Sequence, residues 1–268
     1  MPKTILVTGS TDGIGQKAAK MLAEQGHHVV LHGRNGTKLA KVQQELAELP
    51  RGGRVEHYVA DLSRMADVEA LATAVAERHA SLDVLINNAG VYHTSQRVTD
   101  DGLDVRFAVN TIAPYVLTQR LLPRLGASGR VINVSSAAQA PVDPEALAGR
   151  RALTDFDAYA QSKLALTMWS RHMARSLGDD GPAIIAVNPG SMLGTKMVKQ
   201  AFGVAGSDIN IGAEILTRAA LTDPFAAASG QYFDNDSGQF AAPHPDALDP
   251  QKSEPIVRAI EAVLADVL

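Results

Sequence analysis

Six short apolar segments recur along the chain and constrain its fold more than any other feature of the sequence. The segments between them carry apolar residues at helical spacing. Runs such as 84–86 and 131–132 do not alternate with polar residues, as expected of parallel strands covered on both faces. The pattern predicts an α/β fold, a doubly wound parallel sheet (Rossmann fold) of about seven strands with helices on both faces. The six expected strands cover residues 4–8, 28–32, 54–60, 83–87, 130–134 and 183–188.

Local signals also predict where helices begin and end. Ser63 is the expected N-cap of a helix over 64–79. Gly26 is the expected C-cap of the first helix, and Pro50 closes the second. Further along, residues 230–233 are expected to form the seventh strand and residues 251–268 a final helix.

Composition limits the classes of protein to consider. A chain of 268 residues that is 46% hydrophobic can bury a full core, so we expect one domain over residues 1–268. The formal net charge of −4 lacks the basic excess of a nucleic-acid binder. Cysteine is absent, which excludes thiol catalysis and disulfides. We find no signal sequence and no apolar run of membrane-span length, and we expect a cytoplasmic protein.

The segment 8–15, Thr-Gly-Ser-Thr-Asp-Gly-Ile-Gly, follows the first apolar run and opens a helical pattern. A strand that ends in such a turn and feeds a helix directs free N–H groups and the positive end of the helix dipole at one point, which suits a pyrophosphate. Gly9 permits the tight turn, Gly13 lets the backbone approach phosphates, and Gly15 lets the helix pack closely. Ordinary turns also contain such glycines, so the segment alone leaves cofactor site and structural turn equally open.

Tyr159 and Lys163 lie in a pattern that predicts a long helix, where they are one turn apart on one face. A phenol with a pKa of about 10 is a poor acid or base at neutral pH, but a nearby ammonium favours the phenolate. Lys163 could therefore make Tyr159 usable as an acid or base. Such a pair also occurs often by chance, so it needs support from other motifs.

Six motifs occur in a fixed order along the chain. They are the glycine loop at 8–15, Asn87 to Gly90 (NNAG), Asn110, Ser135-Ser136, Tyr159 to Lys163 and Pro189-Gly190. In this order and rough spacing the motifs resemble those of the short-chain dehydrogenase/reductase family, over essentially the whole chain. The resemblance implies an NAD(P)-dependent oxidoreductase that acts on CH–OH or C=O groups.

The resemblance also implies a role for individual residues. Tyr159 would be the acid/base that exchanges a proton with the substrate oxygen, while Lys163 would lower its pKa and bind the nicotinamide ribose. Ser136, rather than Ser135, would hold the substrate oxygen, and Asn110 would bind a water that links Lys163 to solvent. The implied cofactor contacts are Gly9, Ser10, Thr11, Asp12, Gly13, Ile14, Gly15, Arg34, Asn35, Asp61, Leu62, Asn88, Ala89, Gly90, Tyr159, Lys163, Pro189 and Gly190.

Two segments break the regular spacing of strands and helices. Residues 137–157 separate Ser136 from Tyr159, and this insertion resembles the retinol-dehydrogenase-like and protochlorophyllide-reductase-like branch. Residues 191–210 include several large apolar side chains, which an exposed loop has little reason to carry. Ligands of open α/β sheets bind beyond the carboxyl ends of the strands, so both segments are candidate walls of a substrate pocket. For 191–210 we favour a pocket wall over a surface loop. The expected substrate is a small, fairly apolar carbonyl or alcohol.

The end of the second strand bears on the choice of cofactor. No acid stands there for the ribose 2′-OH, and Arg34 can hold a 2′-phosphate bidentately, which favours NADP(H) over NAD(H). Asp12 argues against NADP(H), because many NADP-dependent members of the family carry Lys or Arg at that position. Asp61, with Leu62 beside it, resembles the family acid that accepts the adenine amino group; an N-cap role is the alternative. Thr195 follows Gly190 by one position more than the family pattern, which leaves its nicotinamide contact unassigned.

Several alternatives remain open at this stage. The eight histidines form no HxxH, HExxH or Cys/His spacing, so we predict no metal site. The main competing function is a non-catalytic NADP(H)-sensing protein, and the presence of both Tyr159 and Lys163 favours an enzyme. A nucleotide-sugar epimerase is disfavoured, because its TGxxGxxG loop and large substrate domain are absent. A homo-oligomer is a weak expectation, since the branch with the insertion includes monomers.

Overall fold

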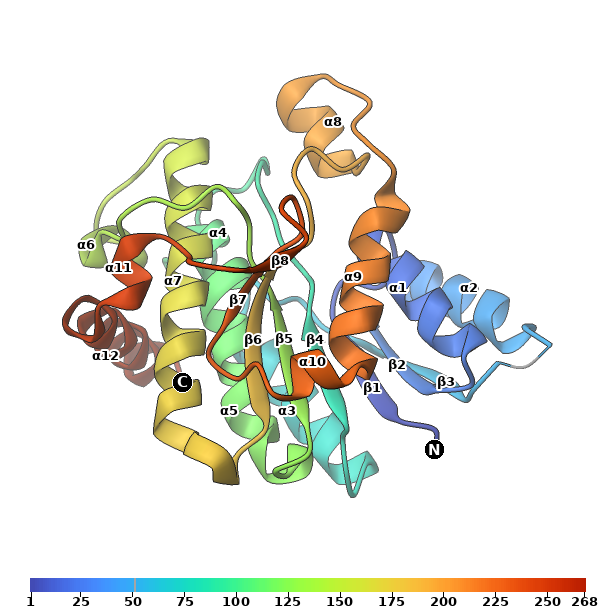
Figure 1. Ribbon diagram of the computed structural model, residues 1–268. Coiled ribbons are helices and arrows are strands. Elements are labelled where there is room, and N and C mark those ends of the chain that lie inside the picture. Colours follow the sequence, from blue (N-terminus) through green and yellow to red (C-terminus); the bar gives the residue numbers. More distant parts are fainter. Residues whose placement is uncertain (51) are drawn as a thin grey trace.

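A computed structural model describes residues 1–50 and 52–268 (Figure 1). At its centre is an eight-stranded sheet in the order β3-β2-β1-β4-β5-β6-β7-β8. Neighbouring strands pair in parallel except β7 and β8, which are antiparallel. The strands are β1 (Thr4–Val7), β2 (His28–Gly33), β3 (Val55–Val59), β4 (Val84–Asn87), β5 (Arg130–Val134), β6 (Ala183–Asn188), β7 (Tyr232–Asp234) and β8 (Gln239–Ala241).

Helices cover both faces of the sheet, and each face has its own apolar core. Because side chains alternate along a strand, Ile5 and Val7 pack toward α1, α2 and α9, whereas Leu6 packs toward α3, α5 and α7. The long helices are α1 (Gly13–Glu24), α2 (Gly36–Ala47), α3 (Met65–Arg78), α5 (Ala113–Leu125), α7 (Asp155–Leu177), α9 (Ile209–Leu221) and α12 (Pro250–Val267). The short ones are α4 (Val105–Phe107), α6 (Pro144–Leu147), α8 (Lys196–Phe202), α10 (Asp223–Ala226) and α11 (Pro245–Leu248), with a π-helical turn at Ala108–Ile112 and a 3-10 turn at Gly178–Asp180.

The predicted fold class, a doubly wound parallel sheet, is confirmed. Burial on both faces explains why the apolar runs do not alternate with polar residues. The additional strand β8 is three residues long, too short to give a pattern of its own. Phe240 on this strand packs against Phe225 and Phe233, with ring centroids 5.2 and 5.1 Å apart.

The prediction that Ser63 caps α3 was wrong. Arg64 occupies the N-cap position without a side-chain hydrogen bond, and the Ser63 hydroxyl donates instead to Asp61 Oδ1 at 2.8 Å. The backbone N–H of Met65, at the start of α3, donates to Asp101 Oδ2 at 2.9 Å. A carboxylate distant in sequence thus satisfies the helix terminus, which local capping rules cannot detect.

The other two helix ends lie close to their predicted positions. The C-cap of α1 is Gln25, and Gly26 follows it with a φ of 81°, the usual place of a left-handed glycine. Helix α2 ends at Ala47, shortly before Pro50.

The C-terminal segment packs against helix α7. Helices α11 and α12 lie beside α7 (Figure 1). The Tyr115 hydroxyl on α5 donates to Glu261 Oε1 on α12 at 2.9 Å. Within residues 1–50 and 52–268, no helix is long and apolar enough to cross a bilayer.

Candidate active site

A cavity of about 540 Å³ opens at the carboxyl ends of the parallel strands. Its lining comes from the glycine loop after β1, the ends of β2, β4, β5 and β6, and from α7 and α8. Strand β1 lies between β2 and β4, so the chain changes winding direction at this point of the sheet. Such a switch point is where open α/β sheets bind ligands.

The glycine loop packs directly against the Asn88-Ala89 segment. A Cβ on Gly9, whose φ is 67°, would lie 2.8 Å from Ala89 Cα. A Cβ on Gly15 would lie 2.3 Å from Asn88 Nδ2. At Gly13, whose φ is 60°, the nearest atom is 4.0 Å away, so the backbone there borders free space. The loop therefore has the shape of a phosphate cradle, in which Gly13 borders free space and close packing requires Gly9 and Gly15.

Hydrogen bonds from the Asn88-Ala89 segment fix the loop in place. Asn88 Nδ2 donates to the Thr8 carbonyl at 2.9 Å, and the backbone N–H groups of Asn88 and Ala89 donate to Thr8 Oγ1 at 3.0 and 3.1 Å. Asn88 thus shapes the cradle as well as lining the cavity.

His32 is a buried part of the site that the sequence analysis did not identify. It is 2% exposed; its Nδ1 accepts the Gly9 N–H at 3.3 Å, and its Nε2 lies 3.2 Å from the Ala60 carbonyl. Burial lowers its pKa to about 4. A neutral imidazole with Nε2 protonated satisfies both contacts, so His32 holds the glycine loop to β2.

Three of the predicted catalytic residues meet at the cavity. Ser136, Tyr159 and Lys163 all line it, and Lys163 Nζ lies 5.7 Å from the centroid of the Tyr159 ring. Ser135 is 2% exposed and its hydroxyl bonds Thr167 Oγ1 at 2.8 Å, whereas Ser136 is half-buried. This arrangement favours Ser136 as the residue available to a substrate.

The pKa of Tyr159 differs from the value that the sequence predicted. Burial raises the pKa of Tyr159, and the Ser136 hydroxyl opposes this effect. Lys163 is 3% exposed, donates to the Val134 carbonyl at 2.6 Å, and has its pKa lowered to about 7 by burial. The pKa of Tyr159 is therefore raised in this structure rather than lowered, because burial of the phenol outweighs the hydrogen bond with Ser136.

Asn110 lies behind the cavity rather than on its wall. It sits in the π-helical turn Ala108–Ile112, a local widening that is frequent at functional sites. Its Nδ2 donates to the Val91 carbonyl and to Ser162 Oγ at 2.9 and 3.0 Å, and its Oδ1 accepts the Val91 N–H at 2.8 Å. Asn110 therefore joins the segment after β4 to the catalytic helix α7.

A buried arginine fixes the first residue of the catalytic helix. Arg106 is 1% exposed and forms ion pairs with Asp104 and with Asp155, the first residue of α7. Asp155 also forms an ion pair with Arg97 and contacts His93 Nδ1, each at 2.8 Å. Since Tyr159 follows one turn later, this cluster sets where the phenol points.

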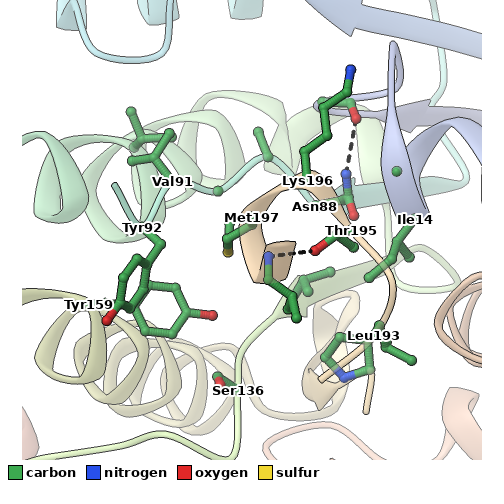
Figure 2. Close-up of a pocket in the computed structure, with 18 of the residues that line it drawn as sticks. Ile14, Asn88, Val91, Tyr92, Ser136, Tyr159, Leu193, Thr195, Lys196 and Met197 are labelled. Carbon is green, nitrogen blue, oxygen red and sulfur yellow. Dashed lines mark hydrogen bonds between the residues drawn. The ribbon is translucent and has the colours of Figure 1, made fainter. Parts of the chain in front are cut away.

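An aromatic wall lies next to the reacting groups. The Tyr92 ring packs against Tyr159, with ring centroids 5.2 Å apart (Figure 2). It also packs against Phe202, with ring centroids 5.7 Å apart. Phe156 from the segment 137–157 and Met197 from the segment 191–210 also line the cavity. The sequence analysis missed Tyr92 and Phe202 as a pair, although the apolar content of 191–210 was a sign of this wall.

Helix α8 closes onto the glycine loop through a charge pair. Lys196 at its start bonds Asp12, which also accepts the Gly13 N–H at 2.8 Å as the N-cap of α1. Thr195 caps α8 through the Val198 N–H at 3.2 Å and lines the cavity (Figure 2). Asp12 therefore has a structural role, because it caps α1 and pairs with the start of α8.

Most of the other predicted cofactor contacts line the cavity, but three do not, and neither does the predicted catalytic residue Asn110. Ser10, Gly15, Asn35 and Asn110 lie outside the lining; Ser10 Oγ donates to the His32 carbonyl at 3.2 Å, and Asn35 caps α2 through the Lys38 N–H at 2.9 Å. The lining includes Gly9, Thr11, Asp12, Gly13, Ile14, Arg34, Asp61, Leu62, Asn88, Ala89, Gly90, Pro189 and Gly190.

The family model for short chain dehydrogenases matches residues 3–203. The chain belongs to the short-chain dehydrogenase/reductase family. Human polyprenol dehydrogenase is 36% identical over 210 residues, which are 75% of this chain and 63% of that protein, less than two thirds of its length. Human retinol dehydrogenase 13 is 30% identical over 270 residues, or 92% of this chain and 80% of that protein. These relatives identify an oxidoreductase of the retinol-dehydrogenase-like branch.

Solved structures agree with the assignment. A protein from Mycobacterium paratuberculosis superposes with a TM-score of 0.80 at 26% identity, covering 97% of this chain and 92% of that chain. The ketoreductase LanV with bound NADP has a TM-score of 0.70 at 29% identity, covering 87% of this chain and 93% of that chain. Members of the family with this fold thus bind NADP.

We expect acid to destabilise the protein through His32. Its pKa in the folded state, about 4, lies below the ordinary value of 6.5, so the unfolded state takes up the proton first. The stabilisation is complete above pH 6.5 and is lost as the pH falls to 4, a change of roughly 3 kcal/mol in the free energy of unfolding. Urea unfolding at several pH values should show this loss in the wild type and a smaller one in His32→Gln. Equal losses of stability in the wild type and in His32→Gln would refute this role of His32.

Replacing the buried Arg106 should lower the free energy of unfolding much more than replacing an exposed arginine. We expect Arg106→Gln to lower the free energy of unfolding by about 3–5 kcal/mol, because Asp104 and Asp155 would lose their buried partner. The control is Arg150→Gln, whose side chain is 62% exposed and pairs with Glu145, and which should leave the free energy of unfolding nearly unchanged. Denaturant unfolding measures both; similar costs for the two variants would contradict the expectation.

Proposed function

We propose that the chain is an NADP(H)-dependent oxidoreductase that transfers a hydride between nicotinamide and a carbonyl or alcohol, with Tyr159 as the acid/base. The observation that carries the proposal is one cavity with Ser136, Tyr159 and Lys163 on its wall and the glycine cradle and Arg34 on the same lining. We further propose that residues 1–268 act as one domain. A cytoplasmic location and a homo-oligomeric state stay predictions from the sequence.

The properties of Tyr159 suit proton donation to a substrate oxygen. Its raised pKa keeps the phenol protonated at neutral pH, as an acid for carbonyl reduction must be. Ser136 is placed to donate to the same oxygen as negative charge develops. A nicotinamide cofactor supplies or accepts the hydride when bound. In the oxidative direction the phenol must first lose its proton, so this direction is favoured at higher pH.

The cavity wall supports an apolar substrate. Tyr92, Phe156, Phe202 and Met197 surround the approach to Tyr159, and Phe156 and Phe202 are about half exposed, at 52% and 49%. Large apolar side chains left open to solvent usually mark a binding surface. The names of the relatives, polyprenol dehydrogenase and retinol dehydrogenase, refer to long apolar alcohols and agree with this proposal.

Arg34 supports NADP(H) over NAD(H). It lines the cavity at the end of β2, is exposed, and has no ion-pair partner within residues 1–50 and 52–268. A guanidinium in this position can bind a 2′-phosphate through two parallel hydrogen bonds. The NADP complexes among similar structures give further support.

Replacing the phenol tests the enzymatic proposal against the sensor alternative. In Tyr159→Phe we expect the rate of hydride transfer to fall roughly 100- to 10,000-fold, because the general acid is lost while the ring is kept. A panel of apolar aldehydes and ketones, followed by NADPH absorbance, measures the rate. Tyr58→Phe, on β3 and outside the cavity lining, is the control. Tight NADPH binding by the wild type without turnover of any substrate would favour the sensor.

Replacing Arg34 tests the choice of cofactor. We expect Arg34→Ala to weaken NADPH binding roughly 10- to 100-fold, because a charged hydrogen-bond pair is lost, and to leave NADH binding nearly unchanged. Fluorescence titration of both cofactors gives the dissociation constants, with Arg150→Ala as a matched exposed control. Equal losses for the two cofactors would remove the basis for NADP(H) preference.

A further inference from the structure

We propose that His28, Glu56 and His79 form a binding site for a divalent transition-metal ion of the zinc type. The three residues lie at the amino ends of the strands, whereas the cavity with Tyr159 lies at the carboxyl ends. The site is therefore separate from the proposed reaction and is not one of its parts.

Three potential ligand atoms converge within this cluster. Glu56 Oε1 lies 3.0 Å from His28 Nε2 and 2.8 Å from His79 Nε2, and all three atoms lie within 4.8 Å of one another. Ligands at about 2.0–2.1 Å from a tetrahedral zinc ion are roughly 3.3 Å apart. Small movements of the side chains would thus admit the ion between them.

The same atoms have no good hydrogen bonds to each other. Although both distances are short enough, neither contact is aligned as a hydrogen bond, and all three atoms are buried without another partner in the described part of the chain. Buried polar groups in this state cost free energy unless they are satisfied. A shared cation would satisfy the lone pairs of all three.

The cluster is held by rigid elements. His28 begins β2, Glu56 lies on the neighbouring β3, and His79 is the C-cap of α3. His28 is two residues before Val30, so it shares the face of the sheet that packs against α3. A metal ion here would join β2 and the edge strand β3 to the end of α3.

The charges around the cluster leave one carboxylate oxygen for a metal. Arg54 Nη2 and Arg78 Nε lie 3.3 and 3.7 Å from Glu56 Oε2, on the oxygen that faces away from the imidazoles. Both arginine side chains are largely exposed, at 58% and 61%, so solvent screens their repulsion of a cation. Two imidazoles and one carboxylate favour zinc over magnesium or calcium, which prefer oxygen ligands.

Metal titration of the tag-free, chelator-treated protein tests the proposal directly. We expect one equivalent of Zn²⁺ to bind in isothermal titration calorimetry and to raise the melting temperature, because the folded state alone holds the assembled site. Co²⁺ in place of Zn²⁺ should give the visible absorption bands of a four-coordinate ion. Failure of the wild type to bind either metal would reject the site and leave only a His–Glu–His contact.

Variants locate the binding on the chain. We expect at least about tenfold weaker Zn²⁺ binding, and loss of the Co²⁺ bands, in Glu56→Gln and in His79→Ala. His172→Ala, a partly exposed histidine on α7, should bind as the wild type does. Glu56→Gln keeps the shape of the side chain, and its circular dichroism checks that the fold persists. Unchanged binding in both ligand variants would show that the metal binds elsewhere and would overturn the proposal.

Discussion

The close approach of the Asn88-Ala89 segment to the glycine loop is the constraint on which the site depends. A side chain on Gly9 or Gly15 would overlap this segment, and Thr8 Oγ1 accepts from both of its N–H groups. The contact joins the ends of β1 and β4, the two strands on either side of the cofactor position. The loop can therefore hold a fixed shape before any ligand arrives, which lowers the entropy cost of binding.

From this contact, a series of polar links leads to the reacting groups. Val91 follows the same segment and pairs with Asn110, which in turn bonds Ser162 on α7. Arg106 fixes the start of that helix through Asp155. The catalytic helix is thus oriented at two points on either side of Tyr159. Sites built on rigid elements in this way keep the geometry that proton transfer requires.

The fold could be predicted from the sequence, and so could three residues that meet at the cavity, because both leave local patterns. Apolar runs revealed the sheet, and ordered motifs revealed Ser136, Tyr159 and Lys163. Contacts between distant segments leave no such pattern. Asp101 caps α3 in place of Ser63, and the Lys163 amine donates to the carbonyl of Val134. The histidine spacing likewise gave no sign of a metal site, because its ligands come from three separate elements.

Strand β2 carries a buried or half-buried histidine near each of its two ends. His28 and His32 lie four positions apart and so share one face, one at the amino end of the strand and one at the carboxyl end. His32 is satisfied by Gly9 and Ala60, so its imidazole has no capacity left for a metal. His28 has no such partners, and its Nε2 is free to meet Glu56 and His79. The same residue type on one strand therefore has two roles, and its hydrogen-bond partners rather than its sequence context decide which.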